Sequence, residues 1–476
     1  MRYFRSIMVF LEFFLLFLLF NPFLFAYISL PFDSYELQRL LQWGVFSLAF
    51  VHLVVDAEVR RHAFGFWQSL VSYKKILLSL ILILGLISSC TASYPGYALL
   101  EVSTFYAMAM TIFLFTGLFC QGKAIFLRRF YVFIVITFAV SCGLSLLMWF
   151  YFLTLPVMHG IGDPYTLLAS PGYMNRRFYD DVACMVLPIL IMLSIRQEQP
   201  KFQLNSLIFL MLAYLYTRGI ISHSRIYLFE PVALLILFPL FYRRRSLPFL
   251  VVQAAAIGVG YALYFLLYQH HGVAPAGFPD RATFLNNRVL LWRIAANLVW
   301  HHPLLGVGPL HFNLYAYPIE TYAAHPHSAI AVIASEWGLP VLVMVSILAI
   351  SGLWSSVKRR AFLPIGLMGS LIGGFMMLQV DGLIVMPPGE MMLSLILAWA
   401  FACHGQSVTE VTQKVLSPWA ELTLLSLFLL SLFTLLWVGL PILMNMNESI
   451  MDFMGACKGF CELAPDYWSQ GFIQYY

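Results

Sequence analysis

Two histidines, His325 and His327, flank a proline in the segment HPHSAIAVIASEWGLP of a chain that is otherwise mostly apolar. A neutral imidazole has an ordinary pKa of about 6.5, so it can take a proton from a hydroxyl group near neutral pH. Proline is favoured in the first turn of a helix. The pattern predicts that His325 stands where a helix begins. His327 is expected in the first turn, where it acts as a general base, hydrogen-bonds a substrate or caps the helix.

Arginines stand in the same part of the sequence and in two earlier segments. Arg288 and Arg293 precede the histidines, Arg225 ends the stretch SHSR, and Arg176 and Arg177 end the stretch PGYMNRR. A guanidinium group binds phosphate oxygens with two parallel hydrogen bonds and stays protonated. These residues predict an anionic, phosphate-bearing ligand. Contact with lipid headgroups is the alternative for any single one of them.

The elements that must hold these side chains are membrane-spanning helices. The chain has 476 residues, of which 61% are hydrophobic and only 10% are charged. A helix needs about 20 apolar residues to cross a bilayer, and such runs recur along nearly the whole chain. We predict an all-α polytopic membrane protein with about 12–13 transmembrane helices in a single membrane domain, residues 1–476. The predicted spans are residues 7–30, 38–55, 76–93, 98–119, 126–153, 182–196, 203–220, 226–242, 247–268, 339–355, 362–382, 389–404 and 420–440.

The basic residues of the short loops set the expected orientation. They all fall on one side if the spans alternate, and that side is the cytoplasmic one. The N-terminus is then cytoplasmic, and a small loop (154–181), a large loop (269–338) and the C-terminal tail (441–476) face outward, into the periplasm of a bacterial inner membrane. Eight of the nine outer cations are arginine: Arg39, Arg176, Arg177, Arg218, Arg225, Arg281, Arg288, Arg293 and Lys458.

The large outer loop has internal structure. Between residues 287 and 300, Val289, Trp292, Ala296 and Val299 recur at helical spacing, which predicts an amphipathic helix lying on the membrane surface. A turn at Gly306 and Gly308 separates it from the helix that begins at the histidine pair. That second helix is expected to run to Gly338 and Pro340.

Other polar residues of the outer side receive weaker assignments. Glu336 lies on the opposite face of the helix from His327 and is expected to pair with an arginine or to cap a loop. We expect His301, His302 and His311 to be surface or turn residues. The histidines lack a carboxylate at ligand spacing, so no metal site is predicted. Cys457 and Cys461 stand four residues apart in the tail, where a local disulfide is plausible in an oxidising compartment.

Three stretches together resemble a known family. SHSRIYLFEPVALLIL resembles its Ser-Arg motif, NNRVLLWRIAANLVWHHPLLGVGPLHF its Arg, Trp and Gly-x-Gly sequence, and HPHSAIAVIASEWGLP its histidine block. The combination is similar to the O-antigen ligase and polymerase superfamily. That superfamily includes lipopolysaccharide O-antigen ligases, Wzy-type polymerases and bacterial protein O-oligosaccharyltransferases. The clear match covers residues 170–340.

The resemblance implies a membrane glycosyltransferase of the C-type fold that needs no metal or nucleotide cofactor. It would take a glycan from an undecaprenyl-diphosphate carrier at the periplasmic face, with inversion at the sugar carbon. Carried over residue by residue, the family histidine falls on His327, and its arginines fall on Arg225, on Arg288 and on Arg176 or Arg177. Many members have His-Asn where Ser328 follows His327, so the second polar contact differs. His325, Ser328 and Trp292 are the remaining expected substrate contacts.

The three types of enzyme in this superfamily differ in the acceptor of the glycan. An O-antigen ligase uses a lipid A-core sugar, a polymerase a growing glycan, and a protein O-oligosaccharyltransferase a Ser or Thr hydroxyl. We favour the ligase type, and we expect membrane lipids but no nucleic acid among the partners. A transporter of lipid-linked glycans is a more distant alternative. It would need charged residues along a central path, whereas the predicted span interiors carry almost none.

Overall fold

The computed structural model describes residues 2–25, 34–121, 123–154, 176–195, 202–222, 226–267, 281–316, 325–358, 363–380, 382–405 and 416–441. In these ranges the regular structure is helical and contains no strand. The α-helices are α1 (Arg2–Phe20), α2 (Ser34–Val55), α3 (Ala57–Ser69), α4 (Ser72–Thr91), α5 (Pro95–Gln121), α6 (Lys123–Thr154), α8 (Arg176–Ile195), α9 (Phe202–Ile221), α10 (Ile226–Tyr242), α11 (Leu247–Leu267), α12 (Arg281–His301), α13 (Phe312–Ala316), α14 (Ala329–Val332), α15 (Leu339–Lys358), α16 (Ile365–Val380), α17 (Pro387–Gly405) and α18 (Pro418–Thr434).

The predicted fold class is confirmed. Each predicted span falls on a helix, and 10 of the described helical stretches are long and apolar enough to cross a membrane. One of these, Phe229–Leu266, contains both α10 and α11, which a 3-10 turn at Arg243–Ser246 separates. The chain reverses there, and the rings of Phe238 on α10 and Phe249 on α11 meet edge to face with their centroids 4.9 Å apart. Two further apolar helices, α16 and α17, are shorter.

Two predicted boundaries are wrong. The first span was expected to reach residue 30, but α1 ends at Phe20 and a short 3-10 turn begins at Pro22. Proline disfavours helical geometry at the residue before it, which explains the early end. At the other boundary, α8 begins at Arg176, so the end of the predicted small loop 154–181 is already helical.

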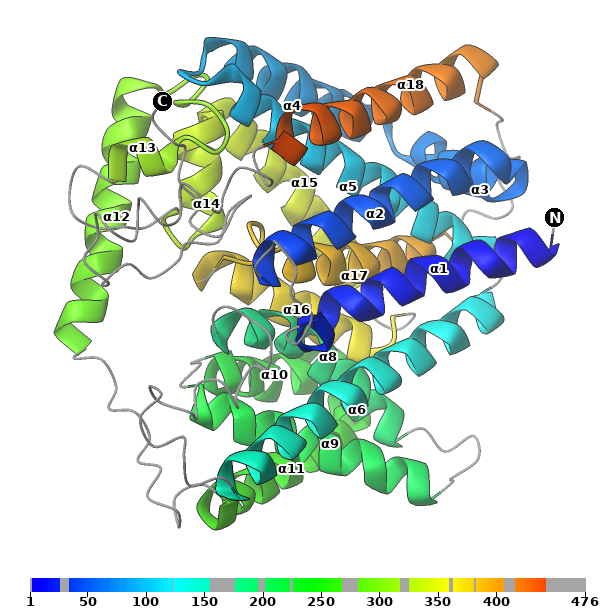
Figure 1. The fold of residues 1–476 in the computed structure, drawn as a ribbon, viewed down its shortest axis with the longest axis vertical. Coiled ribbons are helices and arrows are strands. Elements are labelled where there is room, and N and C mark those ends of the chain that lie inside the picture. Colours follow the sequence, from blue (N-terminus) through cyan, green and yellow to red (C-terminus); the bar gives the residue numbers. More distant parts are fainter. Residues whose placement is uncertain are drawn as a thin grey trace.

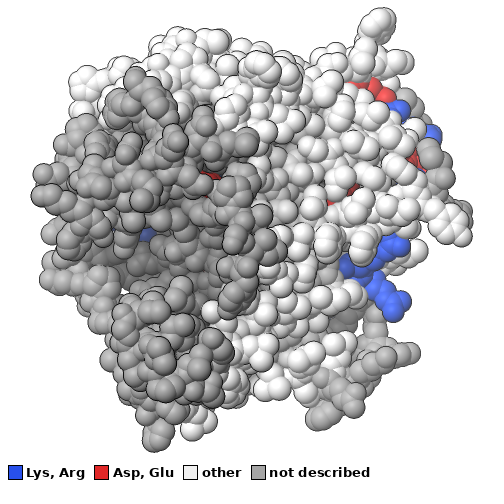
Figure 2. Space-filling model, viewed as in Figure 1, with Lys and Arg blue, Asp and Glu red and all other residues white. Residues whose placement is uncertain are grey.

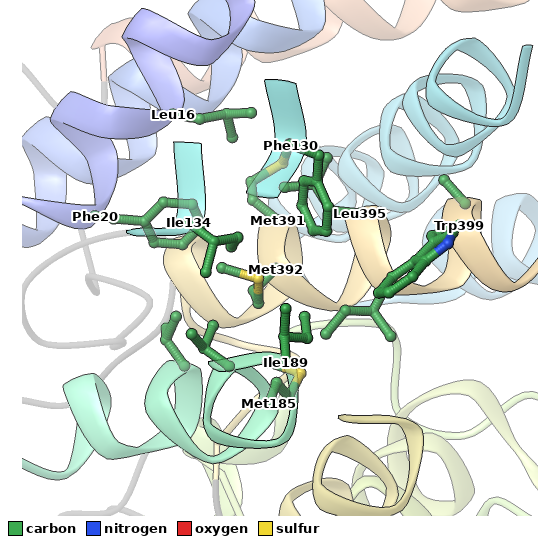
Figure 3. Packing of buried hydrophobic residues seen from close by; sticks show 14 of the residues in the cluster. Leu16, Phe20, Phe130, Ile134, Met185, Ile189, Met391, Met392, Leu395 and Trp399 are labelled. Carbon is green, nitrogen blue, oxygen red and sulfur yellow. The ribbon is translucent and has the colours of Figure 1, made fainter. Parts of the chain in front are cut away.

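Helix α17 lies in the centre of the bundle. Figure 3 shows its side chains packed against those of α1, α6 and α8, with the labelled contacts Leu16, Phe20, Phe130, Ile134, Met185, Ile189, Met391, Met392, Leu395 and Trp399. Helix α16 lies directly against α8, because Gly366 and Gly373 leave room for the backbone oxygens of Pro188 and Cys184. Such small residues let spanning helices approach closely and gain van der Waals contact, which is the main packing force inside a bilayer.

Two of the arginines expected on the outer side are buried inside the bundle. Arg39 on α2 is 1% exposed and forms an ion pair with Glu390 on α17 at 2.9 Å. Gln42 completes this group, since its amide donates to the same carboxylate at 2.6 Å. Arg218 on α9 is fully buried, with its guanidinium carbon 3.5 Å from the centre of the Tyr179 ring. Both residues hold helices together within the bundle.

The two ends of the bundle carry different elements. Helices α12, α13 and α14 gather at one end, where α12 runs across the ends of the spanning helices, and α3 lies at the other end with the N-terminus (Figure 1). On the face drawn in Figure 2, the visible charged side chains gather mainly at the α3 end, and the broad middle is uncharged. The expected amphipathic helix therefore lies across the bundle, as a surface helix would. Which end faces the periplasm stays a prediction.

An ionic cluster holds the α3 end. The Asp56 carboxylate accepts hydrogen bonds from the backbone N–H groups of Glu58 and Val59 and from Arg5 on α1, whose Nη2 lies 2.9 Å from Oδ1. Burial alone would raise the pKa of Asp56, but these donors stabilise the charged form and hold its pKa below the usual value. Asp56 thus caps α3 and joins it to α1.

Candidate active site

The end of the bundle opposite α3 is organised by two chain segments that clamp each other. The first, residues 303–308, follows α12, and the second, residues 335–339, leads into α15. Backbone hydrogen bonds join them from Leu339 N–H to the Pro303 oxygen at 2.9 Å, from Gly308 N–H to the Glu336 oxygen at 3.1 Å, and from Val307 N–H to the Ser335 oxygen at 2.9 Å. We call this pairing the loop clamp. It fixes the Gly-x-Gly turn against the helix that follows the histidine pair.

Two glycines make the loop clamp possible. Gly306 and Gly338 adopt φ of 68° and 88°, a left-handed region that favours glycine. A Cβ on Gly306 would lie 2.3 Å from the Glu336 carbonyl carbon, and one on Gly338 would lie 2.3 Å from the Leu304 oxygen. No larger residue fits at either position without moving the backbone. The GVG turn predicted from the sequence is therefore confirmed, and its role is close packing.

Glu336 caps the loop after the clamp. Its carboxylate accepts the N–H of Leu310 and the N–H of Phe312, both at 2.9 Å, and the side chain is buried. Burial raises the pKa of Glu336 to about 7, although the two backbone hydrogen bonds act in the opposite direction. The structure thus places Glu336 in the loop-capping role that we expected as one of two alternatives.

A buried histidine fixes the same loop to the turn between α4 and α5. His311 Nδ1 lies 2.7 Å from the Pro309 oxygen, and its Nε2 lies 3.0 Å from the backbone nitrogen of Tyr94. Only the neutral tautomer with the proton on Nδ1 satisfies both contacts. Burial lowers the pKa of His311 and favours this neutral form, despite the opposing bond to Pro309. Of the two alternatives expected for His311, the surface position is wrong and the turn is confirmed, because the side chain is buried and its backbone N–H donates to the Gly308 oxygen at 3.2 Å. His301 and His302 are exposed as predicted.

Helix α12 packs on the loop clamp with a face that the sequence analysis did not single out. Leu291, Ile294, Ala295 and Leu298 are buried against Val307, Phe312 and Ala316. The predicted apolar stripe faces away from the bundle, with Val289, Trp292 and Ala296 exposed, as a helix on a membrane surface would have it. The helix is apolar on two sides, so periodicity alone could not tell the protein-facing side from the outer one.

The exposed Trp292 nevertheless touches the histidine segment. Its indole N–H donates to the Pro326 oxygen at 3.1 Å, between His325 and His327. Arg288 stands four residues before Trp292 on α12 and is half-buried. Residues four apart share a helix face. The hydrogen bond therefore places the histidine segment beside the face of α12 that carries Arg288.

The helix after the histidines begins later than predicted. Residues 325–328 are not helical, and α14 starts at Ala329 with Ser328 as its N-cap. His327 therefore precedes the helix and has φ of 50°, a left-handed conformation that is uncommon outside glycine. The serine hydroxyl takes the capping position, because Ser is favoured there. The helix ends at Gly338 as expected, after a π-helical turn at Ile333–Trp337, but Pro340 belongs to α15.

The two histidines differ in their surroundings. Their rings meet edge to face with centroids 4.3 Å apart. His325 is only 4% exposed, and a Cβ on Gly382, in the turn before α17, would lie 2.7 Å from its Nε2. His327 is more accessible. His325 thus packs under the turn between α16 and α17, whereas part of His327 stays exposed.

The other predicted site residues separate into three groups. Arg293 is exposed on α12, five residues after Arg288 and about 140° around the helix from it. Arg176 and Arg177 open α8, and their side chains lie outside the described residues. Arg225, Cys457 and Cys461 also lie outside the described residues. Of the predicted set, the structure brings together His325, His327, Ser328, Trp292 and, one turn along α12, Arg288.

Sequence reasoning missed the residues of α4 that dock the loop clamp. The Ser88 hydroxyl donates to the Leu305 oxygen at 2.7 Å. One turn earlier, Gly85 leaves room for Trp337, since a Cβ there would lie 2.4 Å from its ring. Small polar residues in an apolar span were the available signal. In the part of the chain that the structure describes, no three His, Cys, Asp or Glu side chains are grouped so that they could hold a metal ion.

Residues 206–346 match the family model described as O-antigen ligase. The match supports the predicted superfamily. It covers α9 to α12, the loop clamp, the histidine segment and the start of α15. No curated protein matches the chain. The multi-pass helical fold and the family match together support a membrane protein with glycosyltransferase-like activity of the O-antigen ligase and polymerase type.

Proposed function

We propose that the protein transfers a glycan from an undecaprenyl-diphosphate-linked donor to a hydroxyl acceptor at the periplasmic face of the bacterial inner membrane. The observation that carries this proposal is the contact between Trp292 and the Pro326 oxygen at 3.1 Å. It puts the reachable histidine, His327, beside the helix face that bears Arg288. A proton acceptor next to a permanent cation suits a reaction that deprotonates a hydroxyl while a diphosphate leaves.

The reaction balances with these groups. The acceptor hydroxyl gives its proton to a ring nitrogen of His327, and its oxygen forms a bond to the anomeric carbon of the sugar. The bond from that carbon to the diphosphate oxygen breaks, and the electron pair leaves with the diphosphate. Arg288 stabilises the developing charge, with help from Arg225 and from Arg176 or Arg177. Attack opposite the leaving group inverts the anomeric carbon.

The acceptor that we favour is a sugar hydroxyl of lipid A-core, as in an O-antigen ligase, because the family model carries that description. A protein hydroxyl, as in pilin glycosylation, and a growing glycan, as for a Wzy-type polymerase, are the alternatives. All three use the same donor chemistry, so the role of His327 does not depend on the choice.

The test is complementation of a gene deletion with the wild type and with His327→Ala, comparing lipopolysaccharide banding with pilin mass. We expect His327→Ala to lower transfer by about 10²–10⁴-fold, the usual contribution of a general base. Added imidazole should restore part of the activity, and the matched variant His325→Ala should not respond to it. Full transfer by His327→Ala would remove the base assignment. A deletion that changes neither lipopolysaccharide nor pilin would contradict the favoured lipid A-core acceptor and the protein alternative.

A further inference from the structure

A cavity of about 450 Å³ opens beside the loop clamp, on the side formed by α4 and the end of α12. Its lining comes from three separate segments of the chain: Thr91, Ser93, His301, His302, Pro303, Leu304, Leu305, Gly306, Val307 and Tyr315. Cavities that bind small molecules usually lie between about 300 and 1,000 Å³. We call this cavity the clamp pocket.

The walls of the clamp pocket are held by hydrogen bonds within the protein. Gly306 N–H donates to the His302 oxygen at 3.0 Å, and the Ser88 hydroxyl donates to the Leu305 oxygen at 2.7 Å. On the α4 side, the Thr91 hydroxyl donates to the Ser88 oxygen at 3.0 Å. The pocket is therefore preformed, and a ligand does not have to order its walls.

The chemistry of the lining selects a neutral, hydroxyl-rich ligand. Among the described residues that line the pocket there is no Lys, Arg, Asp or Glu, so nothing there compensates a phosphate or another fixed charge. His301 Nδ1 lies 2.9 Å from the Asn297 oxygen and must donate to it. In the neutral ring this leaves Nε2 as an acceptor. The Thr91 hydroxyl likewise donates to a backbone oxygen of its own helix, so its own oxygen can still accept a hydrogen bond. Ser93 and Tyr315 add two hydroxyl groups and an aromatic ring.

We propose that the clamp pocket binds a neutral sugar unit of the glycan that the active site handles. The inference rests on the proposed function and adds the place where the sugar chain, rather than its diphosphate, is held. The loop clamp couples the two places, because Val307 in the pocket wall bonds Ser335 in the helix that follows His327. The sugar belongs either to the lipid-linked donor or to a glycan acceptor.

The first experiment measures binding by the full-length protein in lipid nanodiscs. The probes are two fluorescently labelled oligosaccharides, one released by mild acid from the lipid-linked pool of the host and one released from its lipopolysaccharide core. We expect at least one to bind, and His301→Ala and Tyr315→Phe each to weaken that binding about five- to tenfold, the effect of a lost hydrogen bond. Inorganic pyrophosphate should not displace the probe.

The matched control is His62→Ala at the opposite end of the molecule. His62 is partly exposed, and its Nδ1 lies 2.9 Å from the oxygen of the residue four positions earlier, as in His301. We expect this variant to bind like the wild type. Binding of neither probe, unchanged binding by both pocket variants, equal weakening in His62→Ala, or displacement by pyrophosphate would each overturn the proposal.

Steady-state kinetics then separate the two sources of the sugar. A pocket for the donor glycan predicts that His301→Ala raises KM for the lipid-linked donor at saturating acceptor, with kcat unchanged. A pocket for an acceptor glycan predicts that His301→Ala raises KM for the acceptor at saturating donor, with kcat unchanged. Weakened binding without a change in either KM would reject the pocket as a substrate site. The binding result stays distinct from the proposed function, because His327→Ala should lower transfer by about 10²–10⁴-fold and still bind the oligosaccharide.

Discussion

The arginines of the bundle and the arginines of α12 belong to the same predicted outer set, yet the structure uses them differently. Arg39 and Arg218 are at most 1% exposed, and each contacts a partner on another spanning helix. Arg288 is half-buried and Arg293 exposed on the helix that lies across the bundle. Arginine on the outer side therefore marks two functions. Inside the bundle it joins helices, whereas on α12 we propose that it binds the ligand.

The difference teaches that residue type and membrane side are not enough to assign a phosphate site. A buried guanidinium needs a carboxylate, a carbonyl or an aromatic face, because desolvation of an unpaired charge is costly. Arg39 has Glu390 and the Val385 oxygen, the latter at 3.0 Å. Partners of this kind come from distant parts of the sequence and cannot be read from local spacing.

The largest expected effect tests the bundle side of this comparison. Arg39→Ala leaves Glu390 buried without its cation, and we expect the free energy of unfolding to fall by about 3–5 kcal/mol. The double variant Arg39→Met/Glu390→Met removes both charges and should recover most of that loss. Thermal unfolding in nanodiscs measures both. If Arg39→Ala unfolds like the wild type but loses transfer, Arg39 is a ligand-binding residue, and the distinction between bundle arginines and α12 arginines is wrong.

The next effect tests the α12 side. Arg288→Ala should lower kcat/KM by about 10²–10³-fold, the usual cost of removing one donor to a developing negative charge, with little change in unfolding temperature. The matched variant Arg293→Ala, on the other side of the same helix, should lose less than about tenfold. Transfer assays with purified protein measure both. A reversed order would mean that the diphosphate binds the exposed side of α12.

A smaller effect concerns Arg218. Its guanidinium lies over the Tyr179 ring, and a desolvated cation–π contact contributes about 2 kcal/mol. Tyr179→Leu removes the ring and should lower the free energy of unfolding by about that amount. Tyr179→Phe keeps the ring face and is the control. Equal losses in both variants would assign the stabilisation to the tyrosine hydroxyl instead.

A separate effect, outside the arginines, is a pH dependence at the loop clamp. Burial raises the pKa of Glu336 from 4.5 to about 7, so between these values the folded protein binds a proton that the unfolded chain has released. The stability that this group contributes is complete below about pH 4.5 and is lost as the pH rises through 7. The unfolding temperature of the wild type should therefore fall by roughly a few degrees over this range relative to Glu336→Gln. Parallel pH profiles would show that Glu336 stays ionised throughout.

Much of the fold could be predicted from the sequence, because apolar length is a strong signal in a membrane protein. Each predicted span falls on a helix, and the helix expected at residues 287–300 appears as α12. The boundaries at Phe20 and Arg176 were wrong, and the protein-facing side of α12 was not predicted. In each case the deciding contacts come from elsewhere in the chain or from a neighbouring proline, whereas hydropathy reports only the local average.

The candidate site was predictable in its residue types but less so in its geometry. Trp292 does bond the histidine segment at Pro326, whereas the start of the helix at Ser328 and the burial of His311 were missed. The preference of proline for the first turn predicted a helix that begins at Pro326. In the structure the helix begins after the Ser328 cap, and His327 before it is left-handed. The loop clamp docks on Ser88 and Gly85, which lie more than 200 positions away in the sequence, so local sequence patterns cannot predict this contact.

The backbone at His327 has a consequence for how the protein tolerates change. A non-glycine residue in the left-handed region costs about 1–2 kcal/mol, and the φ of 50° puts His327 there. Glycine or asparagine would suit this position better, so His327→Gly should fold more stably while it loses the imidazole. A search for stabilising substitutions would then select against the very side chain assigned to catalysis. At this residue, substitutions that raise thermal stability are therefore expected to lower transfer activity.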